Sequence, residues 1–368
     1  MSWRVCCEFG DGEVHYGKAL KADQRVSNGS VHVFGSSGIV GNHDKTLCSY
    51  PTIIIGRKGS VGAITWAPDG GWIIDTAYYV EIKDNNKLDL RYLFYILSGI
   101  DLTKKTITTS IPGLNRDDLY DTFIKLPPFE EQKRIVDLLD KAEGIRQKRE
   151  QAIKLADDFL RAKFLEMFGT PANNIHRFPK GTIRDLVDSV NYGTSAKASI
   201  DSGEYPILRM GNITYQGRWD FTDLKYLDLS VKEKDKYLVK EGDLLFNRTN
   251  SKELVGKTAV YEEDRPMAFA GYLIRVRPNS IGNNYYISGY LNSIHGKITL
   301  MNMCKSIVGM ANINAQELQN IEILIPPKHL QDEYEIIYKK IKKGLSIYDK
   351  SAMQLQLLAS NLSNKYFM

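Results

Sequence analysis

The chain has 368 residues, of which 43% are apolar and 25% charged, and its formal net charge is +5. This length exceeds what one hydrophobic core usually serves, so we expect two domains, and the composition argues against a disordered chain. No run approaches the roughly 20 apolar residues that cross a bilayer, and the first residues lack the order of a signal peptide. We therefore expect a cytoplasmic protein.

Cysteine and histidine do not form a metal-binding or redox pattern. The four cysteines, Cys6, Cys7, Cys48 and Cys304, never stand in the C-x-x-C spacing of a zinc site or redox motif, and the six histidines lack ligand spacing. No serine or cysteine is accompanied by the partners of a catalytic triad. The sequence therefore predicts reduced thiols, no metal, no cofactor and no catalytic centre.

Residues 1–126 are predicted to form a first globular unit of the α+β class. They contain short β-branched strands, glycine turns and polar loops, a mixture typical of that class. The segment IIIGRKGSVGAITW, from Ile53, reads as an apolar strand, an arginine-bearing turn and a second strand.

A long helix is predicted over residues 127–170, after the double proline Pro127-Pro128. Proline lacks the N–H that a first helical turn leaves unpaired, so the pair can end a strand and open a helix. Apolar or small residues then recur at alternating three- and four-residue steps, as in a heptad repeat. The stripe consists of Ile135, Leu138, Ala142, Ile145, Ala152, Ala156 and Phe159.

Residues 171–325 are predicted to form a second α+β unit, and residues 326–368 a second long helix. The segment LLFNRTNSKELVGKTAVY, from Leu244, repeats the plan of strand, arginine-bearing turn and strand. The helix again follows a double proline, Pro326-Pro327. Its apolar stripe consists of Ile337, Ile341, Leu345, Tyr348, Ala352, Leu355 and Leu362.

An internal repeat relates the two halves. A shift of 199 residues aligns NRDDLYDTFIKLPPFEEQ, from Asn115, with NAQELQNIEILIPPKHLQ, from Asn314, and six of the eighteen positions are identical. At about 1.5 Å per residue the first helix would be about 60 Å long, so its stripe needs an equally long partner. We predict that the two helices form an antiparallel coiled-coil pair that separates the globular units. The alternative, that each stripe packs on the core of its own unit, stays open.

Three motifs carry a resemblance to a known family. They are LPPFEEQKRI from Leu126, IGRKGSVG from Ile55 and GDLLFNRT from Gly242. With the layout above, they make the whole chain resemble the specificity subunit of Type I restriction-modification systems. The second proline motif departs from the first, since IPPKHLQ, from Ile325, lacks the paired glutamates.

The resemblance implies a non-catalytic subunit with two target recognition domains. Each domain would read one half of a split double-stranded DNA target, and the long helices would set the gap and dock methyltransferase subunits, two of them. Restriction or translocase subunits would complete the assembly. Within it, methyl transfer to adenine and cleavage would belong to the partners.

Candidate DNA-reading residues are donors on loops between strands, because arginine and lysine suit guanine edges and asparagine suits adenine. In the first unit these are Ser36, Ser37, Asn42, His43, Arg57, Lys58 and Ser60. In the second unit they are Tyr192, Lys197, Arg209, Asn212, Asn247, Arg248, Asn250, Ser251, Lys252, Lys305 and Ser306. Arg57 and Arg248 have a second interpretation, as structural residues that bond loop carbonyls.

Two other functions stay open. Asp69 precedes Glu81 and Lys83 at an interval compatible with a PD-(D/E)xK nuclease, whose carboxylates hold Mg²⁺. However, Asp69 stands in APDGG, a composition that by itself indicates a turn. The other alternative is a coiled-coil scaffold whose globular units bind proteins rather than DNA.

Overall fold

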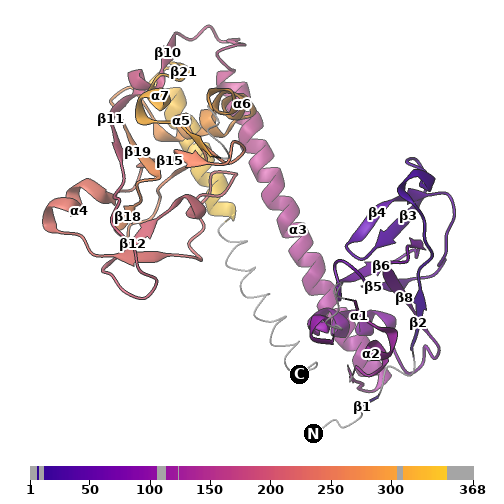
Figure 1. Cartoon of the computed structure of the whole chain (residues 1–368). Coiled ribbons are helices and arrows are strands. Elements are labelled where there is room, and N and C mark those ends of the chain that lie inside the picture. The colour runs from indigo at the N-terminus through magenta and orange to yellow at the C-terminus, as the bar shows by residue number, and fades with distance from the viewer. Residues whose placement is uncertain (1–5, 8–11, 106–112, 123, 305–309, 346–368) are drawn as a thin grey trace. The chain divides into compact units, whose positions relative to one another are not determined.

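A computed structural model describes residues 6–7, 12–105, 113–122, 124–304 and 310–345 (Figure 1). The chain divides into two compact units, and the boundary between them falls within a long helix. Unit 1 comprises Met1–Lys148 and Asp349–Met368, and unit 2 comprises Arg149–Tyr348. Both units combine helices and strands, which confirms the α+β class. In the part of the chain described, no helix is both long and apolar enough to cross a membrane.

Helix α3 (Phe129–Phe168) is 40 residues long and begins directly after the first double proline. The N–H groups of Glu131 and Gln132 donate to the carbonyl of Pro128, at 2.8 and 3.1 Å, and so close the first turn. Its acidic residues Glu130 and Glu131 stand in the first turn, where the positive end of the helix dipole makes negative charge stabilising. The proline pair therefore explains where the helix starts.

Two larger sheets of unit 1 lie ahead of α3 in the described part of the chain. Four antiparallel strands lie in the order β2-β8-β5-β6, and three strands lie in the order β4-β3-β7, with β3 and β7 parallel. The elements are β1 (Cys6–Cys7), β2 (Gly12–Tyr16), η1 (Ala22–Gln24), β3 (Val31–Gly35), β4 (Gly38–His43), β5 (Thr52–Gly56), β6 (Ile64–Ala67), β7 (Trp72–Ile73), β8 (Ala77–Ile82), α1 (Leu90–Gly99), η2 (Leu102–Lys105), α2 (Arg116–Tyr120) and β9 (Ile124–Lys125).

Unit 2 follows α3 and ends with a helix over residues 328–345. Four antiparallel strands lie in the order β11-β19-β15-β17, and four others in the order β13-β12-β18-β14, with β12 and β18 parallel. The elements are β10 (Lys180–Thr182), η3 (Ile183–Leu186), β11 (Val187–Tyr192), β12 (Tyr205–Leu208), η4 (Met210–Asn212), β13 (Lys225–Leu227), α4 (Val231–Tyr237), β14 (Leu238–Val239), β15 (Leu244–Asn247), β16 (Thr249–Asn250), β17 (Thr258–Val260), β18 (Met267–Phe269), β19 (Leu273–Pro278), α5 (Asn284–Asn292), α6 (Ile294–Met303), β20 (Ala311–Asn312), α7 (Ala315–Gln319) and β21 (Glu322–Leu324).

The two units have the same strand order. β2, β8, β5 and β6 of unit 1 stand where β11, β19, β15 and β17 stand in unit 2, and β4, β3 and β7 correspond to β13, β12 and β18. Each unit also closes with a short antiparallel pair, β1 with β9 and β10 with β21. Unit 2 differs by the extra strand β14 beside β18 and by the pair β16 with β20.

The core of unit 1 lies between its four-stranded sheet and α1. Ile53 and Ile55 from β5 and Tyr92 from α1 are all buried in it. Asp89 caps α1 by accepting the N–H of Tyr92 at 2.8 Å. Ile135 from α3 joins the same core and is 2% exposed, so this end of α3 packs on its own unit.

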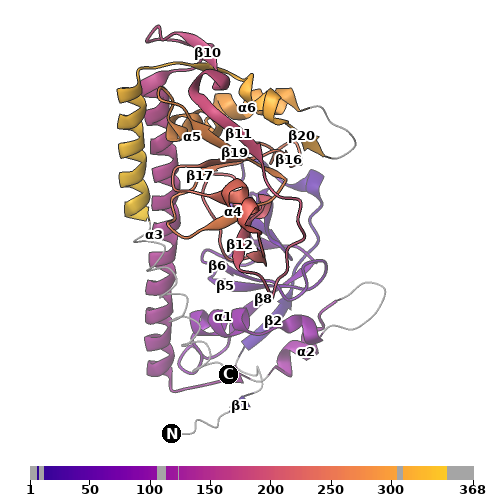
Figure 2. The ribbon, with the colours of Figure 1, turned by 90° about the vertical axis from the view of Figure 1, so that its left-hand side faces the viewer.

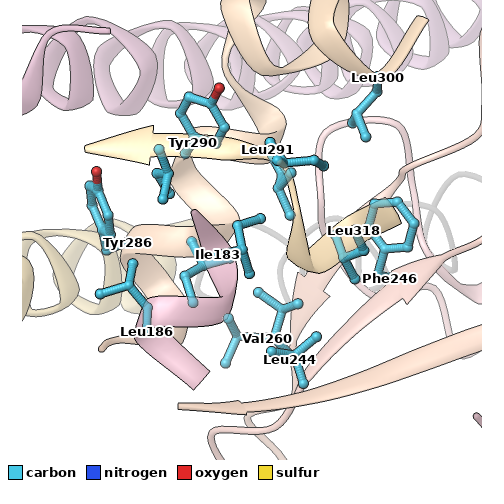
Figure 3. Close-up of a cluster of buried hydrophobic side chains, with 14 of the residues drawn as sticks. Ile183, Leu186, Leu244, Phe246, Val260, Tyr286, Tyr290, Leu291, Leu300 and Leu318 are labelled. Carbon is cyan, nitrogen blue, oxygen red and sulfur yellow. The ribbon is translucent and has the colours of Figure 1, made fainter. Parts of the chain in front are cut away.

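The core of unit 2 lies between its four-stranded sheet and α5, as Figure 3 shows. Leu244 and Phe246 of β15 and Tyr286 and Leu291 of α5 belong to one buried cluster, in which Phe246 lies beside Leu318 and Tyr286 near Leu186. The buried hydroxyl of Tyr286 has a hydrogen-bond partner, because it donates to the carbonyl of Leu324 at 2.7 Å. Burial of such large side chains supplies most of the driving force for folding.

The C-terminal end of α3 also enters this core. Phe164 and Phe168 are buried, and their rings lie 5.3 and 5.8 Å from the ring of Tyr334, on the helix of residues 328–345. Figure 2 shows this helix, in yellow, beside the end of α3. Leu160, Phe164 and Phe168 are the buried positions here, rather than the predicted Phe159, which is 48% exposed. A one-residue step turns a side chain by about 100° around a helix, which accounts for the difference.

The other residues of the two predicted apolar stripes differ in how far they are buried. Leu138 and Ile145 are exposed, Ala142, Ala152 and Ala156 are half-buried, and on the last helix Ile337 and Ile341 are half-buried while Leu345 is buried. Tyr348, Ala352, Leu355 and Leu362 lie outside the described residues. The pairing of the two stripes therefore stays a prediction.

Candidate nucleic-acid interface

In unit 1, two predicted turns meet at one end of the sheets. The turn between β3 and β4 carries Ser36 and Ser37, and the turn after β5 carries Lys58 and Ser60. A Cβ placed on Gly59 would lie 3.4 Å from the Ser36 hydroxyl oxygen, so the two turns are in contact. Ser37, Lys58 and Ser60 are exposed and Ser36 is half-buried. These four residues form one polar surface.

Asn42 and His43 do not belong to that surface. They end β4, four and five residues beyond Gly38, which is about 13 to 17 Å at about 3.3 Å per residue. The Asn42 side-chain oxygen lies 3.0 Å from Nδ1 of His32, and the His43 ring stands edge-on to Trp72 at 5.4 Å. The prediction grouped these two residues with the turns, but the length of β4 separates them.

In unit 2, the turn after β12 occupies the place that the β3–β4 turn occupies in unit 1. Arg209 donates to both the carbonyl and the carboxylate of Asp223, each at 2.8 Å. Asn212 is 3% exposed, and its side chain accepts the N–H of Arg209 and donates to the carbonyls of Asp220 and Asp223. The Asn212 amide is thus used inside the turn in this conformation, and a base contact by Asn212 stays a prediction.

The turn after β15 carries the largest group of candidates. Asn247 is fully buried and donates to the carbonyl of Leu254 at 3.4 Å, and that it reads a base stays a prediction. Asn250 and Ser251 are half-buried and Lys252 is exposed. These three remain candidates.

Lys252 lies near Cys304, the residue that follows α6. Burial raises the pKa of the Cys304 thiol, and the Lys252 ammonium opposes that rise, which requires the two groups to be near each other. Lys305 and Ser306 follow Cys304 directly but lie outside the described residues, and Lys197 is exposed on the loop after β11.

Arg57 and Arg248 are half-buried and already engaged. Each guanidinium donates to a loop carbonyl and lies over a tyrosine ring, Tyr16 for Arg57 and Tyr192 for Arg248, at 5.1 and 5.0 Å. The structure thus shows the carbonyl bonds that the second interpretation of these arginines required.

The sequence analysis missed Tyr16. It ends β2 at the edge of its sheet, as Tyr192 ends β11, and the two rings are 47% and 42% exposed. The signal was present, since Val14-His15-Tyr16-Gly17 and Val190-Asn191-Tyr192-Gly193 share the pattern V-x-Y-G. A Cβ on Gly17 or Gly193 would lie 2.1 or 2.3 Å from a backbone oxygen, which explains why glycine follows each tyrosine.

The residues of the nuclease alternative do not gather. The Glu81 carboxylate lies 3.0 Å from Nε2 of His15, and Lys83 pairs with Glu13 at 3.6 Å. Asp69 stands in a turn before Gly70, whose φ is +69°. Among the described residues, no three His, Cys, Asp or Glu side chains are placed to hold a metal ion. Nothing in this arrangement favours a metal-dependent nuclease.

Comparison with known proteins gives concordant matches. The family model of the Type I restriction modification DNA specificity domain matches residues 10–155 and 178–359. The chain is 32% identical over 171 residues to a Methanocaldococcus jannaschii protein named as the MjaX type I restriction enzyme specificity subunit, and 24% identical over 256 residues to the EcoKI specificity subunit of Escherichia coli K12. These alignments cover 45% and 66% of this chain, but only 38% and 54% of the relatives.

A solved structure supports the fold. The S subunit of a Type I restriction-modification system from M. genitalium superposes with a TM-score of 0.68 at 16% identity, over 97% of this chain and 94% of that one. Because the family model matches most of the sequence, in two segments that fall one in each half, the chain belongs to the Type I restriction modification DNA specificity domain family.

Proposed function

We propose that this chain is the sequence-reading component of a Type I restriction-modification complex, and that each unit reads one half of a bipartite double-stranded DNA target. One observation carries the proposal: the two units have the same strand order, yet the turns at equivalent places carry different polar residues. Ser36 and Ser37 stand in the turn that corresponds to the turn of Arg209, and Lys58 and Ser60 stand in the loop after β5, which corresponds to the loop of Asn250 and Lys252 after β15. A constant frame with different turns suits two readers of different bases.

The catalytic steps belong to partner subunits in this proposal. Two methyltransferase subunits would modify adenine, and restriction or translocase subunits would cleave. The long helices, predicted over residues 127–170 and 326–368, would form an antiparallel coiled-coil pair between recognition domains at residues 1–126 and 171–325, and would dock the methyltransferases. The 40-residue length of α3 and its exposed Leu138 and Ile145 support this arrangement.

The helix pair would also set the gap between the half-sites. A helix of about 60 Å spans at most about 18 base pairs at about 3.4 Å each, and tilt would shorten this. Deleting four residues between Gln147 and Lys154 should therefore change the spacer while both half-sites stay the same. An unchanged spacer would refute the role of the helices as a ruler.

Methylation mapping tests the proposal as a whole. Host DNA is sequenced from cells that express this chain with its cognate methyltransferase subunit, and from cells that lack the chain. The proposal expects adenine methylation only in the first case, at two short blocks with a fixed gap. No motif, or one continuous block, would favour the scaffold alternative.

A further inference from the structure

In unit 1, Arg57 joins four separate segments of the chain. Its N–H donates to the carbonyl of Thr76 at 2.9 Å, and its own carbonyl accepts the N–H of Leu114 at 3.0 Å. Its guanidinium donates through Nη1 to the carbonyl of Asp75 at 3.2 Å and lies 5.1 Å from the centre of the Tyr16 ring. The residue thus connects β5 to the edge strand β2, to the loop before β8 and to the segment before α2.

In unit 2, Arg248 makes the same set of contacts. Its N–H donates to the carbonyl of Tyr272 at 3.0 Å, and its carbonyl accepts the N–H of Ile313 at 2.9 Å. Nη1 donates to the carbonyl of Gly271 at 3.3 Å, and the guanidinium lies 5.0 Å from the centre of the Tyr192 ring. Every partner stands in the element that corresponds to its counterpart in unit 1.

The loop that follows each arginine is closed in the same way. Gly62 donates its N–H to the carbonyl of Gly56, and Gly256 donates to the carbonyl of Asn247, both at 2.8 Å. The two closing glycines have φ angles of +76° and +77°, a conformation that other residues rarely adopt. Between arginine and glycine the loops differ, since unit 1 has the four residues KGSV and unit 2 the seven residues TNSKELV.

The two units share the frame around this loop but differ in the loop itself, so the two parts can have separate roles. A guanidinium that is half-buried, bonded to a carbonyl and stacked on a ring is held in one orientation, because its donors form a planar fork. It is less exposed than Lys58 or Lys252, which stand on the loops themselves. The loop side chains are therefore free to meet DNA, while the arginines hold the base of each loop.

We propose that Arg57 and Arg248 are positioning residues, each of which orients the loop behind it for reading one half-site without contacting a base itself. This inference rests on the proposed function. It replaces the prediction that both arginines are direct readers, and it assigns Tyr16 and Tyr192 as the rings that hold them.

Lysine substitution tests the inference in the complete complex. R57K and R248K keep the positive charge but lose the planar fork, and each is expressed with the cognate methyltransferase subunit for methylation mapping. We expect R57K to relax the requirement at two or more bases of one half-site by about tenfold, with the other half-site unchanged. R248K should do the same to the opposite half-site, so that each variant is the control for the other.

A matched control separates positioning from stability. Arg25 of unit 1 also bonds backbone carbonyls, those of Val40 at 2.8 Å and Leu20 at 3.4 Å, and neither bond involves the loop after β5. R25K should lower the midpoint of thermal unfolding by a similar amount to R57K and leave the methylated motif unchanged. If R57K changes stability alone, or relaxes a single base only, the inference is wrong, because the arginine is then purely structural or a direct reader.

A second variant covers the case in which R57K does not fold. Y16L removes the ring beneath the guanidinium and leaves the arginine in place, and it should relax the same half-site at several bases. An unchanged motif would contradict the inference. Absence of any bipartite motif with the unmodified chain would instead refute the proposed function, and the inference with it.

Discussion

Gln132 and Gln331 donate corresponding hydrogen bonds in the two units. Both are fully buried near the start of a helix, and each donates Nε2 to the carbonyl of the first proline of its pair, Pro127 at 2.9 Å and Pro326 at 2.8 Å. Each also donates to the loop ahead of the unit's central helix, α1 or α5. They differ at the side-chain oxygen: that of Gln132 accepts the N–H of Asp89 at 2.9 Å, and that of Gln331 has no hydrogen-bond partner among the described residues.

Substituting these glutamines should therefore have unequal effects. Each unsatisfied buried group costs about 1 to 3 kcal/mol. Gln132→Ala should lower the free energy of unfolding of its unit by about 3 kcal/mol, and by more than Gln331→Ala, since Gln132 holds one more partner. Urea denaturation, monitored by circular dichroism, measures the free energy of unfolding of both variants. Gln147→Ala, at an exposed position of α3, is the control and should change little.

Asp243 is predicted to be essential for the stability of unit 2. Its carboxylate receives two hydrogen bonds from Arg277, at 2.7 and 2.9 Å, and lies 3.9 Å from Nε of Arg275, which is 4% exposed. Burial lowers the pKa of Arg275, and Asp243 opposes this. Asp243→Asn would leave a buried guanidinium uncompensated, at a cost of about 3 to 5 kcal/mol. Denaturant titration should show this loss; Asp158→Asn, in an exposed ion pair, should fall within about 1 kcal/mol of the wild type.

The glycines behind the two tyrosines cannot accept a side chain at the present backbone positions. A Cβ on Gly193 would lie 2.3 Å from the carbonyl oxygens of Phe269 and Ala270. Gly193→Ala should therefore force β11 away from this turn, lower the midpoint of thermal unfolding and weaken reading of one half-site. Gly211→Ala, where nothing lies within 4 Å of the new atom, is the matched control. Equal unfolding midpoints for the two variants would contradict the prediction.

We expect the stability of unit 2 to depend on pH because of Lys297. Burial, and then the nearby charges of Lys257 and Arg161, lower its pKa to about 8, and its ammonium contacts the Tyr215 ring at 4.9 Å without a hydrogen bond. In the unfolded chain the pKa is about 10.4. Between these values the unfolded state binds more protons, so this group makes stability rise as pH increases from about 8 to about 10.

Replacing Lys297 by methionine isolates that contribution. The wild type should gain stability relative to Lys297→Met between pH 8 and 10, and the variant should be the more stable protein at pH 7, because it carries no buried charge. Thermal unfolding of both proteins across this range measures the difference, in which the titration of tyrosines and cysteines cancels. A difference that is constant with pH would contradict the assigned pKa.

Hydrophobic pattern and proline chemistry made part of the architecture predictable. Two apolar strands around an arginine-bearing turn are present in each half, as β5 and β6 and as β15 and β17. The proline pair indicated the start of α3, since the effect of proline on a helix is local. The candidate turns on β3–β4 and after β5 could be chosen because glycine and polar residues also act locally.

Burial was not predictable at single positions. Asn212 and Asn247 are of a residue type that can read bases, yet both side chains are buried. In the same way, Phe159 is exposed while Phe164 and Phe168 are buried. These outcomes depend on which face of a turn or helix meets residues far away in the chain, such as Asp223 and Tyr334. Residue type alone carries no information about that meeting.

The sequence by itself determined the α+β class and the elements that short-range preferences set. Only the tertiary structure decided that Arg57 and Arg248 are held by Tyr16 and Tyr192, and that Asn42 lies a strand's length from Ser36. The reason is physical: helix starts and turns follow from the conformational preferences of neighbouring residues, whereas hydrogen bonds and ring contacts between distant segments exist only once the sheets have assembled.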